Sequence, residues 1–139
     1  MKRYALDASA MMIHLENRSG AEKMEKLLTA AEQRDAEIYI SAVNVGEVFY
    51  SVWHRRGESD ARRALTFVKG APIIIVPATL DETILAAEFK AHYQFPLADS
   101  FAASLAISRR ATLITSDSDF RRFSDRLKIL WLSGHKAMN

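Results

Sequence analysis

Carboxylates stand in apolar surroundings at four places in this sequence, and they belong to Asp7, Glu47, Asp99 and the pair Asp117 and Asp119. Glu47 is the only formal charge in segment 38–54, and Asp99 is the only one in segment 91–108. A carboxylate in such surroundings is costly unless it pairs with a cation, accepts hydrogen bonds or binds a metal ion. No nearby Lys or Arg in the sequence offers Asp7, Glu47 or Asp99 a partner, so metal binding has to be considered.

The chemistry of a carboxylate cluster follows from charge repulsion. Two carboxylates about 4 Å apart repel by roughly 4 kcal/mol at an effective dielectric constant near 20. Four of them must take up protons or hold divalent cations, and ligation by oxygen alone suits Mg²⁺ and Mn²⁺. The chain has no Cys, and His14 is the only His in the four segments, which argues against zinc.

Ordinary structural roles compete with metal binding at three of the four places. Asp7 can cap the helix that follows it, and Asp99 can interact favourably with a helix N-terminus. Asp117 with Asp119 can form a turn closed by its own side chain. Glu47 lies inside an expected helix, where no cap is needed. Asp7 and Asp99 alone each leave both interpretations open, and Asp117 with Asp119 alone favours the turn. The whole set, however, favours a metal site.

The elements that must position these acids alternate along the chain. Expected strands cover residues 3–6, 37–40, 73–76, 111–115 and 127–131, with 73–76 interpreted as a buried strand. Expected helices cover residues 9–15, 21–34, 41–55, 57–69, 79–93 and 97–110, with N-caps at Ser41 and Thr79. This alternation predicts a parallel sheet between helices, and functional sites in such folds lie at the carboxyl ends of the strands. All four places can meet at that edge.

Length and composition narrow the class of protein. The 139 residues, 49% of them hydrophobic, indicate one ordinary domain covering residues 1–139. No apolar run is long enough to span a bilayer, the N-terminus does not resemble a signal peptide, and no Cys is present, so we expect a cytoplasmic protein.

The distribution of charge is more informative than the net charge of +2. Without the five acids named above, 12 acidic residues remain against 19 basic ones, a balance that suits an anionic partner. Arg121 and Arg122, beside the acidic turn, are the preferred contacts to such a partner, although a solvated surface position is the simpler interpretation of any single Arg. The full set of candidates is Arg55, Arg56, Arg62, Arg63, Arg109, Arg110, Arg121, Arg122 and Arg126.

Four short motifs occur in a familiar order: Leu-Asp-Ala-Ser at 6–9, the segment 41–48 ending in Glu-Val, Leu-Ala-Asp-Ser at 97–100, and Thr-Ser-Asp-Ser-Asp-Phe at 115–120. In these motifs the whole chain resembles the PIN-domain nucleases, and within them the toxin ribonucleases of VapBC toxin–antitoxin pairs. The resemblance implies a three-layer α/β/α sandwich with a five-stranded, largely parallel sheet in the order 3-2-1-4-5. It also implies endonucleolytic cleavage of RNA that depends on Mg²⁺ or Mn²⁺.

The resemblance also assigns roles to residues. It makes Asp7, Glu47, Asp99 and Asp117 the catalytic, metal-binding carboxylates. Asp119 matches an acid found in part of the family, and Ser9 and Thr115 match hydroxyl positions that help to position the acids or water. Position 8, often Thr in the family, is Ala here, which removes no ligand.

The implied partners are an RNA substrate, a VapB-like antitoxin and a second copy of the chain in a homodimer. Met12 and Met24 could border a groove for an antitoxin helix, although core positions are the simpler interpretation. Trp53 and Trp131 are expected in the core or at a dimer interface.

Three alternatives compete with a toxin ribonuclease. A phosphotransfer domain fits poorly, because the first strand is followed by Asp-Ala-Ser and the third by Pro-Ala-Thr. A catalytically silent module that only binds RNA or protein, and a housekeeping RNA-processing nuclease, both stay open.

Overall fold

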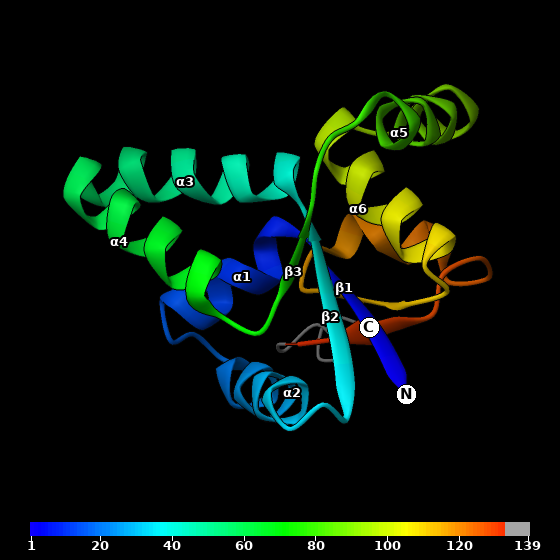
Figure 1. The fold of residues 1–139 in the computed structure, drawn as a ribbon. Coiled ribbons are helices and arrows are strands. Elements are labelled where there is room, and N and C mark those ends of the chain that lie inside the picture. Colours follow the sequence, from blue (N-terminus) through cyan, green and yellow to red (C-terminus); the bar gives the residue numbers. More distant parts are fainter. Residues whose placement is uncertain (133–139) are drawn as a thin grey trace.

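Strands and helices alternate along the chain in the computed structural model, which describes residues 1–132 (Figure 1). The strands are β1 (Lys2–Leu6), β2 (Ala36–Ser41), β3 (Ile74–Val76), β4 (Thr112–Thr115) and β5 (Ile129–Trp131). The helices are α1 (Ala8–Leu15), α2 (Ala21–Glu32), α3 (Ala42–Arg56), α4 (Glu58–Gly70), α5 (Leu80–Tyr93), α6 (Leu97–Ser108) and the 3₁₀ helix η1 (Ser118–Phe123). The five strands are parallel in the order β3-β2-β1-β4-β5, which confirms the expected fold class and strand order.

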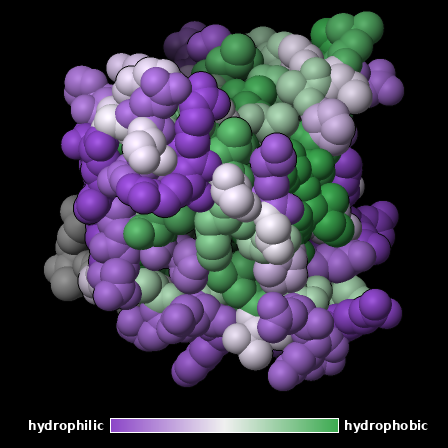
Figure 2. Space-filling model, turned by 60° about the vertical axis from the view of Figure 1, so that its left-hand side comes forward, coloured by the Kyte–Doolittle hydropathy of each residue, from purple (hydrophilic) through white to green (hydrophobic). Residues whose placement is uncertain are grey.

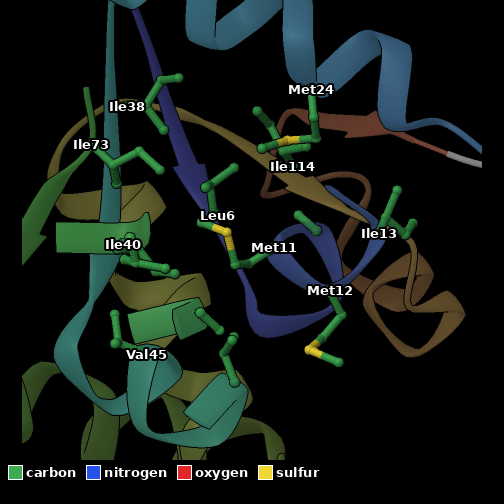
Figure 3. Close-up of a cluster of buried hydrophobic side chains, with 14 of the residues drawn as sticks. Leu6, Met11, Met12, Ile13, Met24, Ile38, Ile40, Val45, Ile73 and Ile114 are labelled. Carbon is green, nitrogen blue, oxygen red and sulfur yellow. The ribbon is translucent and has the colours of Figure 1, made fainter. Parts of the chain in front are cut away.

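Two hydrophobic cores cover the two faces of the sheet, because successive side chains of a strand point to opposite faces. Leu6 and Ile114 belong to the core beneath α1–α4, whereas their neighbours Ala5 and Leu113 belong to the other. Figure 3 shows the first core, with side chains from β1, β2 and β4 packed against those from α1, α2 and α3. The second core is rich in aromatic residues and includes Phe89, Phe95, Phe120 and Phe123.

Side-chain caps begin two helices where the sequence predicts them. The Ser41 hydroxyl accepts a hydrogen bond from the backbone N–H of Val43, at 3.1 Å, at the start of α3. The Thr79 hydroxyl accepts one from the N–H of Glu82, at 3.3 Å, at the start of α5. Both caps satisfy N–H groups that a helix leaves without partners at its first turn.

The third strand differs from its expectation. Residues 73–76 were expected as a buried strand, but β3 is a three-residue strand at the edge of the sheet, and Ile74 is 46% exposed. Pro72 and Pro77 flank it, and proline cannot donate to a ladder, which suits an edge position. The helix η1 was not predicted, because buried side chains from Phe120 and Phe123 hold it rather than any helical periodicity.

The structure places the two methionines in the core but puts the two tryptophans in different surroundings. Met12 and Met24 are buried, so they border no open groove for an antitoxin helix. Trp53 is 42% exposed and lies outside the core, whereas Trp131 is partly buried against the second core. The expected domain of residues 1–139 includes residues 133–139, which lie outside the described residues. No helix within residues 1–132 is both long and apolar enough to cross a membrane.

Candidate active site at the carboxyl edge of the sheet

Asp7 occupies the turn between β1 and α1 and is buried, with 2% of its surface exposed. One of its carboxylate oxygens accepts the backbone N–H of Ala10 at 2.9 Å and the Ser9 hydroxyl at 2.7 Å. The other oxygen accepts the Thr115 hydroxyl at 2.5 Å. These three donors hold the Asp7 carboxylate in one orientation, and Asp7 therefore also caps α1.

The same hydroxyl groups connect the ends of β1 and β4. The Thr115 hydroxyl lies 3.2 Å from that of Ser9 and accepts the backbone N–H of Asp117 at 2.9 Å. The Ser9 hydroxyl accepts the N–H of Ser116 at 3.0 Å. Because β1 and β4 are neighbours, this network places Asp117 beside Asp7. Ser9 and Thr115 thus hydrogen-bond to the acids at this edge, and their role in positioning acids or water stays a prediction.

Asp117 also caps a helix, as its turn-forming alternative predicted. Its carboxylate accepts the N–H of Asp119 at 2.9 Å at the start of η1. Asp117 is partly buried and Asp119 is exposed. The cap uses one oxygen of Asp117 and leaves the other available to a ligand.

Glu47 and Asp99 come from helices that pack together, α3 and α6. Asn44, one turn before Glu47, is fully buried, and its amide donates to the Glu47 carboxylate at 3.0 Å and to the carbonyl oxygen of Ala98 at 3.1 Å. Asn44 therefore ties Glu47 to the residue that precedes Asp99. Sequence reasoning missed Asn44, although an amide one turn from a lone acid in an apolar helix was a usable signal.

The pKa of Asp99 shows that the five acids act on one another. Burial, as the largest cause, and the negative charges of the neighbouring acids together raise this pKa to about 7. In order of effect, these acids are Asp117, Glu47, Asp7 and Asp119. Burial likewise raises the pKa of Asp7 to about 6, against the lowering effect of its three hydrogen-bond donors. The acids that the sequence singled out are therefore gathered at the carboxyl edge of the sheet.

A family model of the PIN domain matches residues 4–126, which is most of the chain. The chain belongs to the PIN-domain family. A search of curated proteins finds no match to this PIN domain.

Solved structures share the fold of this PIN domain at low sequence identity. One is the VapBC2 complex of Rickettsia felis bound to a promoter DNA fragment, with 20% identity, a TM-score of 0.71, and coverage of 92% of this chain and 97% of that one. Another is VapC20 of Mycobacterium tuberculosis, described as a toxin that cleaves the sarcin-ricin loop, with 15% identity, a TM-score of 0.69, and coverage of 86% and 93%. A third is the DNA-bound VapBC of Salmonella typhimurium, with 18% identity, a TM-score of 0.69, and coverage of 95% and 99%.

The donor atoms of this PIN domain suit a hard divalent cation, since every acid in the cluster offers oxygen. Within residues 1–132, no three Asp, Glu or His side chains already stand close enough together to hold a metal ion. The pKa of Asp99 is raised first by burial and then by the neighbouring negative charges, and an acid in such surroundings favours either a proton or a cation. The residues present therefore fit a metal in their chemistry, and their carboxylates have to draw together around it.

Proposed function

We propose that this PIN domain is an endoribonuclease dependent on Mg²⁺ or Mn²⁺, and that it is the VapC-type toxin of a type II toxin–antitoxin pair. The observation that carries this proposal is the convergence of Asp7, Glu47, Asp99 and Asp117 from four separate elements on one sheet edge. A structural role explains one acid at a time, as it does for the helix cap formed by Asp7. It does not explain why four acids lie at the same edge of the sheet.

Asp7, Glu47, Asp99 and Asp117 would hold the metal, and Asp119 would assist from the rim. A divalent ion at such a site activates water for attack on a phosphodiester and neutralises the charge that develops. The protein's own contribution is orientation of the ligands. The hydroxyls of Ser9 and Thr115 hold the carboxylate of Asp7, and the amide of Asn44 holds that of Glu47.

The toxin role is supported by the kind of structure that shares this fold, since several are toxin–antitoxin complexes. We infer a VapB-like antitoxin as partner and an RNA such as tRNA or rRNA, in the cytoplasm, as substrate. A cavity of about 340 Å³ between α1, α3 and α4 would accept an amphipathic partner helix, because its lining combines apolar and charged side chains. These are Leu15, Val52, Ala64 and Phe67, with Glu16, Arg56, Asp60 and Arg63. Figure 2 shows hydrophobic surface bordered by hydrophilic surface on the side of the molecule that it presents. We also expect a homodimer, in which the exposed Trp53 would be buried at the interface between the two copies.

The direct test is cleavage of a mixed tRNA and rRNA preparation with Mg²⁺ or Mn²⁺, and with EDTA. We expect cleavage by the wild type with metal, none with EDTA and none by Asp99→Asn. Asp99 is a better target than Asp7, because Asp7 also caps α1. Asp35→Asn, which removes an exposed carboxylate just before β2, is the matched control and should cleave normally.

Each alternative predicts a different result of this test. Cleavage that persists in Asp99→Asn or in EDTA would mean a contaminating ribonuclease or a wrong site. Metal binding without cleavage of any RNA would favour the silent module. Cleavage by a protein whose gene has no small antitoxin gene beside it would favour the housekeeping nuclease.

A further inference from the structure

A second charged feature lies at the opposite edge of the sheet, where β1, β4 and β5 begin. A cavity of about 780 Å³ opens there. Its lining carries five basic side chains, those of Lys2, Arg3, Arg110, Arg126 and Lys128. No acidic residue is among the residues that the structure describes in this lining. The cavity is therefore strongly positive, whereas the other end of the same strands carries the acids.

The strand order explains how these basic residues meet. Tyr4 of β1 lies beside Thr112 of β4, and Leu113 of β4 lies beside Ile129 of β5. Parallel pairing thus brings the amino ends of three strands together, along with the basic residues that precede or open them. The sequence shows them only as scattered pairs, which is why the preferred RNA contacts were placed elsewhere.

Several of these basic side chains have no acidic partner. Arg3 pairs with Glu37 at 3.3 Å, and the guanidinium of Arg126 lies over the ring of Tyr93 at 5.4 Å. Within residues 1–132, Lys2, Arg110 and Lys128 form no ion pair. By contrast, Arg122, a preferred candidate from the sequence, donates to the carbonyl oxygen of Tyr93 and covers the ring of Phe123.

We propose that this basic cavity binds the sugar-phosphate backbone of single-stranded RNA outside the cleavage site, an inference that rests on the proposed RNA substrate. Its charged side chains are exposed and come from three strand ends, an arrangement that follows an extended polyanion. The cavity offers no buried charged anchor for a compact ligand such as a mononucleotide. Tyr4, Ile107 and Leu130 supply apolar surface between the cations, against which bases can pack.

The two sites are separate enough to be tested independently. Asp7 lies five positions after Lys2, which corresponds to about 16 Å along an extended strand. Substitutions in the cavity therefore leave the acids untouched. Gln is a suitable replacement for Arg110, whose φ of 52° is left-handed, because Gln94 adopts the same φ in this chain.

The experiment compares two double variants in the Asp99→Asn background, in EDTA, so that no RNA is cut. Arg110→Gln with Lys128→Gln alters the cavity, and Lys26→Gln with Lys69→Gln removes the same charge from exposed sites on α2 and α4. Fluorescence anisotropy measures the Kd of a labelled single-stranded RNA of mixed sequence at several salt concentrations. We expect the cavity variant to bind about tenfold more weakly and its slope of log K against log salt to fall by about 1.4, at roughly 0.7 per lost phosphate contact. The control variant should retain most of its affinity and its slope.

Several results would overturn the proposal: no RNA binding by the parent protein, equal losses in both variants, or no loss in the cavity variant. Equally tight binding of duplex DNA of the same length, lost in the same variant, would overturn the assignment to single-stranded RNA. A failure of the proposed nuclease would appear elsewhere, as absence of metal-dependent cleavage by the wild type, and the binding assay does not depend on that activity.

Discussion

Asp7 and Asp117 each combine a structural role with a position in the acid cluster. Both cap the helix that follows, so the local interpretation of each is correct. A carboxylate has two oxygens and several lone pairs, so a cap does not exclude a ligand. Asp99 differs, because no capping hydrogen bond to its side chain occurs at the start of α6 within the described residues. Metal binding by all these acids stays a proposal. A substitution of Asp99 tests it best, because it removes no helix cap.

Asp99 makes stability depend on pH. Burial and neighbouring charge raise its pKa to about 7, far above its ordinary value of 3.8. An acid whose pKa is higher in the folded state stabilises the fold fully below the unfolded value, and that stability is lost as pH rises through about 7. Asp99→Asn should therefore match the wild type near pH 4 and melt higher at pH 8 without metal. Solvent screens a partly exposed group, so we expect about 1 kcal/mol, or roughly 3 °C.

Differential scanning fluorimetry in EDTA across this pH range measures the effect. Asp35→Asn, at an exposed position, should show no such pH-dependent gain. A variant of Asp99 that melts lower than the wild type at pH 8 would show that this carboxylate supports the fold instead of straining it.

Between the elements, the contact of α3 with α6 decides whether Glu47 reaches the cluster. Helix α3 follows β2 at the carboxyl edge and α6 leads into β4. The two helices pack on each other, and the buried Asn44 bridges them. The bridge uses both N–H groups of the amide, while its oxygen has no hydrogen-bond partner within residues 1–132. In the proposed metal site, this amide would orient the Glu47 carboxylate, and we therefore propose Asn44 as a positioning residue.

Asn44→Ala should lower cleavage and weaken Mn²⁺ binding by about tenfold, because the Glu47 carboxylate loses its orienting donor. Calorimetric titration with Mn²⁺ distinguishes this from simple loss of stability. Val45→Ala, at the next and also buried position, is the control. It should lower stability by about 1 to 3 kcal/mol and leave Mn²⁺ affinity unchanged. Equal Mn²⁺ affinity in the two variants would assign Asn44 to packing alone.

For binding of a phosphate chain by the whole molecule, the opposite charges at the two ends of the sheet matter more than the net charge of +2. The carboxyl edge gathers acids that follow β1 and β4 or lie in α3 and α6, and the amino edge gathers the cations of the cavity. A phosphate chain would be repelled by the acid edge unless cations neutralise it. Metal binding is therefore expected to precede substrate binding at that edge.

Mn²⁺ should stabilise the entire fold by mass action, since the metal binds the folded state. At a concentration 100 times the Kd, the gain is about 2.7 kcal/mol, which corresponds to a rise in Tm of several degrees. Thermal melts at millimolar Mn²⁺ should show this shift for the wild type and for Asp35→Asn, and most of it should vanish in Asp99→Asn. The absence of any shift in the wild type would count heavily against the site.

The sequence by itself determined the order of the elements, the parallel α/β class and the acids of the candidate site. Those features depend on local patterns: caps such as Ser41, apolar periodicity, and acids that lack cations nearby in the chain. Only the tertiary structure decided that β3 lies at the edge of the sheet, that Asn44 joins two helices and that Lys2 and Lys128 line one cavity. These features depend on which segments become neighbours, and packing between residues far apart in the chain sets that choice.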